Sequence, residues 1–407
     1  NKENNVFQLV VQYGAGEREF PKLGYAAQLM NNAGIMGAYE PQELKEELSK
    51  LNATCHVTAD DDNLYIIMEG YEATLPQACQ LLSRQILMPK LDEKQLARLK
   101  GSAMGMRQQR KDNVSILNEA LRQYMLYGEK SDYIKELTDK EIYELQISEL
   151  TGDINRASNY EAKVFFTGTL PFDQVYDILS KNLPLVANER PSNSPQAKDM
   201  MPVTENTVYF LPNNDAEQAQ IHLYIPMQKA DKKDDVLRSA FNQYFGLDFT
   251  GIVLNEIREK RSMAYTAYAF VGTQGIAGKA SYLRGYIGTQ NDKANDALDV
   301  LMGLVNDMPK NPERIDNIKS YLRQAMLTSH PSFRNKAMEL VDLGYRGYTD
   351  DPAKENLPKV DALTFDDIVK FYEENIKDKP YCISIMGNPK NIDLKRLEKF
   401  GKVVKLN

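Results

Sequence analysis

Two long segments of this 407-residue sequence repeat one pattern of residues in the same order. In each segment an amphipathic helical pattern stops at Met-Pro-Lys, at residues 88–90 and again at 308–310, and a second amphipathic helical pattern follows. Strand-like segments that end at Gly168 and Gly387 lie 219 residues apart (387 minus 168). Several features in one order at a nearly constant offset predict two copies of one domain of roughly 200 residues.

The repeat divides the chain into a first domain at residues 1–187, a linker at 188–205 and a second domain at 206–407. The linker is rich in Pro, Ser, Asn and charged residues, a composition that is typical of an exposed connection between domains.

The second copy opens with an additional strand pattern at residues 206–213. The first copy has no room for it, because residues 6–13 already match the following strand pattern at 219–227. We therefore expect the first domain to lack its N-terminal strand and the chain to be part of a longer polypeptide.

Within each copy the predicted order is strand, two helices, two strands, a run of helices and a closing helix and strand. Residues 60–63 and 271–279 have the composition of hairpin connections between neighbouring strands. Hairpins mixed with runs of helices indicate an α+β fold, in which helices cover one face of a mostly antiparallel sheet.

Composition excludes several classes of protein. The chain is 42% hydrophobic, which is enough to form real cores, and its net charge of -7 argues against nucleic acid as the main partner. No apolar run approaches the ~18 residues that suggest a membrane span. The three cysteines form no CxxC pair. The compartment stays open, with the periplasm and the cytoplasm both compatible.

The strongest functional signal is LNEIREKRSMAYTAYAF at residues 254–270. It places Arg258 near the end of an amphipathic helix and Tyr265 in the following strand, so that a guanidinium and a phenol can both reach a peptide carbonyl. The alternatives without a binding role are that Arg258 lies on a solvated helix face and that the Tyr265 ring packs within the sheet. An ungapped alignment of the copies puts Leu48 and Cys55 at these positions, so the fold itself does not demand the pair.

This pattern resembles the insulinase/pitrilysin family of zinc metallopeptidases, the inverzincins, which include the mitochondrial processing peptidases. LNEIREKRSMAY looks like the family's L-x-x-x-[IL]-R-E-K-x-G-L-A-Y, and segments 127–133 and 215–223 also match. Ser262 and Met263 depart from the family's Gly and Leu. The resemblance implies two tandem α+β domains of the processing-peptidase type.

The family's catalytic HxxEH motif is absent. Its two histidines correspond to Ala27 and Asn31 and its general base to Met30, while residues 98–111 contain no carboxylate for the distal zinc ligand. We expect no catalytic residue, no metal site and no cofactor in this chain.

The resemblance implies the zinc-less half of such a peptidase, in which Arg258 and Tyr265 bind the substrate. Zinc and HxxEH would belong to a partner half, upstream in the same polypeptide or in a separate subunit, and the substrate would be a peptide. The alternative is a structural or peptide-binding family member with no associated proteolysis. A third reading, an unrelated hydrolase, has no supporting nucleophile and base in the sequence.

Overall fold

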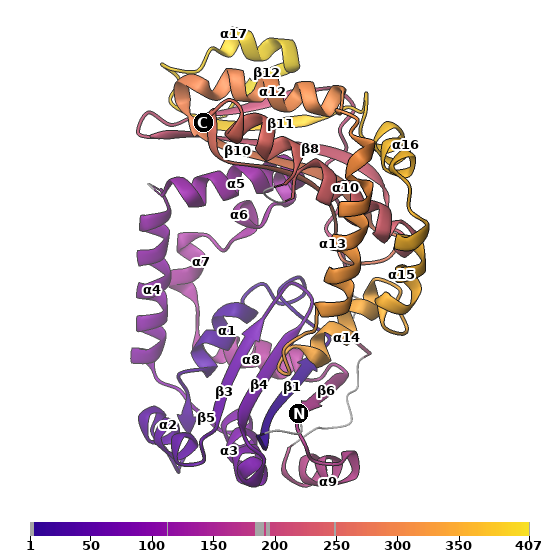
Figure 1. Ribbon diagram of the computed structural model, residues 1–407. Coiled ribbons are helices and arrows are strands. Elements are labelled where there is room, and N and C mark those ends of the chain that lie inside the picture. Colours follow the sequence, from indigo (N-terminus) through magenta and orange to yellow (C-terminus); the bar gives the residue numbers. More distant parts are fainter. Residues whose placement is uncertain (1–3, 112, 184–190, 193–195, 248–249, 407) are drawn as a thin grey trace. The chain divides into compact units, whose positions relative to one another are not determined.

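The computed structural model describes residues 4–111, 113–183, 191–192, 196–247 and 250–406. The chain forms two compact units, which are taken separately below (Figure 1). The first comprises Asn1–Gln109, Leu137–Gln196 and Pro331–Leu340, and the second comprises Arg110–Glu136, Ala197–His330 and Val341–Asn407.

The units do not follow the chain as simply as the repeat predicts. Residues 110–136 belong to the second unit, although they lie within the predicted first domain. Residues 188–190 and 193–195 of the predicted linker lie outside the described residues. The domain borders drawn from the sequence therefore stay predictions.

The first unit is built on a four-stranded antiparallel sheet of order β3-β4-β1-β6. Its strands are β1 (Val6–Tyr13), β3 (Thr54–Ala59), β4 (Leu64–Tyr71) and β6 (Ala162–Thr167), and a small ribbon pairs β2 (Gly34–Ile35) with β5 (Pro89–Lys90). Buried residues alternate along β4, because successive side chains point to opposite faces of a sheet and one face meets the core.

Amphipathic helices supply the other side of this core, whose members include Leu23 of α1 and Leu82 of α3. The helices are α1 (Leu23–Met30), α2 (Pro41–Lys50), α3 (Leu75–Leu87), α4 (Glu93–Lys111), α7 (Asp139–Glu144), α8 (Ile147–Ala157) and α9 (Phe172–Asn182).

The second unit contains a six-stranded sheet of order β12-β7-β11-β8-β10-β9. Strand β7 runs parallel to β11 and β12, and the remaining pairs are antiparallel. The strands are β7 (Thr207–Pro212), β8 (Gln218–Lys229), β9 (Ala264–Thr273), β10 (Ala280–Gln290), β11 (Cys382–Gly387) and β12 (Lys402–Lys405).

One face of this sheet packs on helices to form the second core, with Ile221, Leu223 and Ile225 of β8 at its centre. The helices of this unit are α5 (Val114–Tyr127), α6 (Asp132–Lys135), α10 (Asp235–Phe245), α11 (Ile252–Leu254), α12 (Ala294–Asn306), α13 (Ile315–Thr328), α15 (Pro352–Ala362), α16 (Phe365–Asn375) and α17 (Leu394–Leu397). Helix α14 (Lys336–Tyr345) crosses the border at residues 340 and 341.

The predicted α+β class is confirmed, with largely antiparallel sheets and helices packed against them. The order β3-β4-β1-β6 corresponds strand for strand to β9-β10-β8-β11 in the second unit. Among the described residues, the first sheet has no strand in the place of β7.

In both sheets, an asparagine side chain makes two hydrogen bonds to the backbone of one edge strand. Asn31 donates to the carbonyl of Val57 in edge strand β3 (2.8 Å) and accepts from its N–H (2.7 Å). Asn242 makes the same two bonds to Val271 in edge strand β9, at 3.0 and 2.6 Å. A side-chain amide thus replaces one residue of a paired strand, which protects an otherwise unpaired backbone group.

In the part of the chain described here, no helix has both the length and the hydropathy that a membrane crossing would need.

Candidate functional site

The structure brings Arg258 and Tyr265 together. The guanidinium carbon of Arg258 lies 5.2 Å from the centroid of the Tyr265 ring, a cation–π distance. Tyr265 is 77% exposed, the second highest exposure among the large hydrophobic side chains that lie at the surface, and the Arg258 side chain is 35% exposed. An aromatic that packs in a core would be buried, so the exposure of Tyr265 favours the substrate-binding prediction over the packing alternative.

Neighbouring charges leave Arg258 available to a ligand. Glu256 binds Lys260 (2.6 Å) and Arg261, and these two bonds lower the pKa of the Glu256 carboxyl. Arg258 contacts only Glu259 among the ion pairs of the described residues, through Nε at 3.4 Å. Because this ion pair uses Nε, the two terminal nitrogens keep donor capacity for a ligand.

A π-helical turn at residues 255–259 sets the position of Arg258. In the first unit, α2 ends regularly, and the N–H of Ala53 donates to the carbonyl of Leu48 (2.9 Å), five residues back. In the second unit the N–H of Met263 donates to the carbonyl of Ile257 (3.0 Å), six residues back. One additional residue is accommodated by the wider turn, a feature often found at functional sites.

This comparison corrects the ungapped alignment of the two copies. Leu48 and Ile257 accept the equivalent closing bonds and are both buried, so Leu48 corresponds to Ile257 and not to Arg258. The gap of one residue lies in the π-helical turn itself.

A β-bulge sets the position of Tyr265. Thr266 pairs with Gly288 and Ala264 pairs with Thr289, so Tyr265 is an extra residue on β9. The corresponding strands β3 and β4 pair without a shift from Thr54 to Ala59. A bulge re-aims the side chain that it carries. Each member of the pair thus stands at a local irregularity that the first unit lacks.

The turn between the π-helical turn and the β-bulge is anchored by side chains of β10 and of the residues just after it. Thr289, which is buried, donates from its hydroxyl to the carbonyl of Met263 (2.5 Å), and Lys293 donates to the carbonyl of Ser262 (3.2 Å). These two bonds hold in place the turn that joins Arg258 to Tyr265.

Ser262 has a φ of 49°, in the left-handed region that favours glycine. We expect Ser262→Gly to raise the free energy of unfolding by roughly 0.5–1 kcal/mol, because it relieves the Cβ conflict and loses only part of that gain to chain entropy. Urea unfolding checks this. Ser320→Gly, at an exposed position inside α13, should lower stability by a similar amount; destabilisation by both variants would contradict the assignment of strain to Ser262.

The residues at the family's zinc positions do not fit a metal. Ala27 and Met30 are buried in the first core, and the Asn31 amide is engaged by Val57. Among the described residues no three His, Cys, Asp or Glu side chains gather as a metal-binding group. That this chain holds no zinc stays a prediction from its side-chain chemistry.

A buried polar group on the second sheet was not foreseen from the sequence. Helix α5 covers the face of β8 that carries His222, whose Nε2 lies 2.8 Å from Oδ1 of Asn118. Burial and the nearby Arg284 and Arg122 lower the pKa of His222 to about 3. Since His222 is 2% exposed, no substrate reaches it, and its role is structural.

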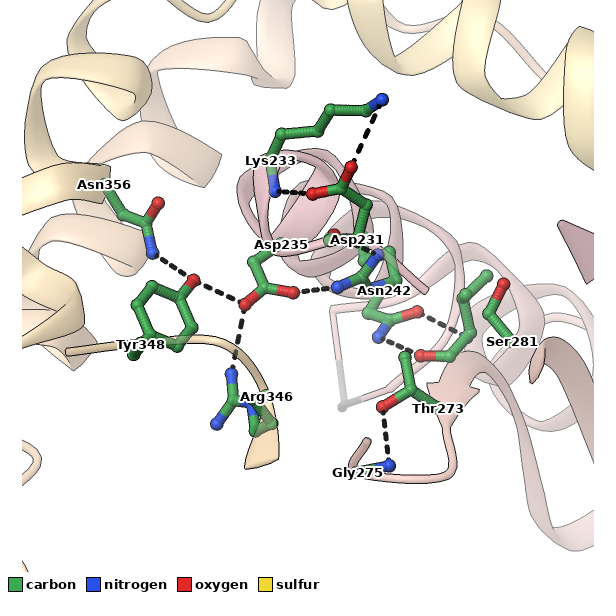
Figure 2. Close-up of polar contacts among 12 residues, drawn as sticks. Asp231, Lys233, Asp235, Asn242, Thr273, Gly275, Ser281, Arg346, Tyr348 and Asn356 are labelled. Atoms are coloured by element: carbon green, nitrogen blue, oxygen red, sulfur yellow. Dashed lines mark hydrogen bonds and ion pairs between the residues drawn. The ribbon is translucent and has the colours of Figure 1, made fainter. Parts of the chain in front are cut away.

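A second polar group ties α10 to the chain that follows α14 (Figure 2). The Asp235 carboxylate accepts bonds from Arg238, from Arg346 (3.1 Å) and from the Tyr348 hydroxyl (2.6 Å), and Asn356 donates to that hydroxyl. It borders a cavity of about 190 Å³. Each of these groups has a partner, so we assign the cluster to stability.

Comparison with known proteins identifies a related family for part of the chain. Residues 158–322 match the family model of the peptidase M16 inactive domain, and this segment contains both Arg258 and Tyr265. No curated protein matches the chain.

Solved structures share the fold across nearly the whole chain. A peptidase M16 inactive domain from Pseudomonas fluorescens is 17% identical, with a TM-score of 0.74 over 96% of this chain and 95% of that one. The periplasmic protease PqqL from Escherichia coli is 14% identical (TM-score 0.72; 95% and 43% covered), and the ferredoxin protease FusC, solved with Arabidopsis ferredoxin, is 12% identical (0.75; 94% and 42%). The chain spans less than half the length of these two proteases.

The segment 158–322 is similar to the inactive domain of M16 peptidases, and the resemblance to the insulinase/pitrilysin family is confirmed.

Proposed function

We propose that this chain is the substrate-binding, zinc-less half of an M16 peptidase and completes the active site of a partner half that carries HxxEH. One observation carries the proposal. The partly exposed Arg258 guanidinium and the exposed Tyr265 ring lie together, each at an irregularity of the backbone that the first unit lacks.

The chemistry of the pair suits a peptide carbonyl. The phenol of Tyr265 and the guanidinium of Arg258 are both donors, and donors aimed at a carbonyl stabilise the negative charge that forms on its oxygen during hydrolysis. Zinc in the partner half would supply the activated water. This chain would hold the peptide in register and exclude solvent when the two halves close.

The names of two similar structures suggest a setting. PqqL is named a periplasmic protease. FusC is named a ferredoxin protease, and its structure was solved in complex with a ferredoxin. By analogy we propose a peptide or small protein as substrate, with the periplasm as one candidate compartment.

The second candidate is a structural or peptide-binding relative without proteolysis. The exposure of Tyr265 (77%) weighs against a purely structural role, whereas a peptide-binding role without proteolysis is separated from the first proposal by the reconstitution experiment.

Reconstitution tests the proposal. We expect the HxxEH half encoded with this chain to cleave unstructured peptides only when the two are combined, and chelation of zinc to abolish cleavage. The partner half alone and this chain alone are the controls. A partner half that is fully active by itself, or a mixture that never cleaves, would overturn the assigned role.

A further inference from the structure

A cleft of about 630 Å³ opens on the first unit, well away in the sequence from Arg258 and Tyr265. It lies among the C-terminal end of α1, the first half of α2 and the middle of α4. Its size is within the range of ligand-binding sites. The lining residues are Gln28, Leu29, Asn31, Asn32, Pro41, Gln42, Lys45, Gln95, Arg98, Leu99 and Ser102.

All the charged side chains that line the cleft are positive. Lys45 and Arg98 contribute two positive charges from two different helices, and no Asp or Glu lines the cleft. In the described residues neither cation has an ion pair, whereas most other arginines of the first unit do. The neutral lining also carries the amides of Gln28, Asn32 and Gln42, and a side-chain amide can both donate to and accept from a peptide backbone.

The floor of the cleft is fixed before any ligand arrives. Gln95 is buried, donates to the carbonyl of Asn32 (2.7 Å) and accepts from the N–H of Asp92 (2.6 Å). Asn31 is held by its two bonds to Val57. A ligand therefore meets a preformed surface and does not have to order it, which lowers the entropic cost of binding.

We propose that this cleft binds a carboxylate-bearing peptide, with Lys45 and Arg98 pairing the carboxylate and the amides meeting the backbone. The net charge of -7 would repel an acidic ligand at long range, so such binding requires a local cationic site of this kind. The choice of a peptide as ligand rests on the proposed function. The cleft would then add a preference for acidic substrates to the half that already holds the scissile region.

Binding measurements on the complete chain test this without any partner half. Fluorescence anisotropy would compare three labelled, unstructured peptides of one length. The first carries Asp and Glu side chains and an amidated C-terminus, the second carries Asn and Gln with a free C-terminal carboxylate, and the third is neutral throughout. We expect the first or the second to bind and the third to bind at least about tenfold more weakly. The stronger of the two tells whether side chains or the C-terminus supply the carboxylate.

Charge-matched variants complete the test. Lys45→Gln/Arg98→Gln should weaken binding of the acidic peptide by about tenfold or more, while Lys163→Gln/Lys181→Gln, which removes the same charge from exposed positions of the first unit, should leave the affinity within about twofold. Equal losses in both variants, or no binding of either acidic peptide, would overturn the proposal. Failure here with normal reconstituted cleavage would leave the role of Arg258 and Tyr265 intact.

Discussion

Tyr265→Phe is expected to lower kcat of the reconstituted peptidase by about a hundredfold, because it deletes one donor to the carbonyl oxygen and leaves the ring in place. Arg258→Ala should cost as much or more, since it removes a charged donor and the cation that lies 5.2 Å from the Tyr265 ring. Arg258→Lys should restore part of the activity through charge alone, without the planar fork. Initial rates on one quenched-fluorescence peptide would measure all three.

Controls separate catalysis from folding in this experiment. Tyr321→Phe removes the same hydroxyl from an exposed tyrosine of α13 and should leave the rate unchanged. Thermal unfolding of the Tyr265 variant should match the parent protein, because Tyr265 is 77% exposed. Wild-type rates in both site variants would show that the pair has no part in hydrolysis.

His222 should make the protein less stable as the pH falls. Its pKa is about 3 in the folded protein, against about 6.5 in an unfolded chain. Below pH 6.5 the unfolded chain takes up a proton that the folded one does not, so stability is lost with falling pH, by about 2 kcal/mol from this group at pH 5. The loss continues until the pH reaches the folded-state value.

The measurement is urea unfolding of the parent protein and of His222→Gln at pH 8, 6.5 and 5. Gln retains a donor for Asn118 but does not titrate. The variant should lose stability less steeply, and the gap between the two proteins should change by about 2 kcal/mol between pH 8 and pH 5. Parallel curves would mean that His222 is hydrated in the folded protein and keeps an ordinary pKa.

Local patterns in the sequence were sufficient for most of the secondary structure. The helix expected after Met-Pro-Lys at 88–90 is observed at Glu93–Lys111, and the strand expected at 206–213 is observed at Thr207–Pro212. Both depend on side chains close in sequence, through helical periodicity or alternation. Residues 60–63 connect β3 to β4 as predicted, whereas the connection predicted at 271–279 begins only at residue 274, because β9 continues to Thr273.

Long-range packing could not be read in the same way. Helix α5 lies about a hundred residues before His222 in the sequence, yet it packs on β8 and β11 of the second unit. Nothing in its amphipathic pattern says which sheet it covers. Burial of His222 was missed for that reason, and the mixture of polar residues on that face of the sheet was the one available signal.

The candidate site was predicted by residue but not by geometry. Residue types and spacing selected Arg258 and Tyr265, whereas the π-helical turn and the bulge depend on a single extra residue at each place. An insertion of one residue leaves almost no trace in a composition pattern. The mistaken equivalence of Leu48 and Arg258 has the same cause, because an alignment without gaps shifts the residues next to a one-residue insertion out of register.

The hydrogen bonds of the Asn31 amide also limit which substitutions residues 27–31 can accept. An HxxEH motif here would require His at residues 27 and 31 and Glu at 30, yet positions 27 and 30 are buried in the first core. A histidine at 31 could not make both bonds that the amide makes to Val57, so it would reopen the edge of β3. Each step towards a metal site would first cost folding stability. Acquisition of a zinc motif at these positions would therefore be opposed by the packing of the first core and by the pairing of edge strand β3.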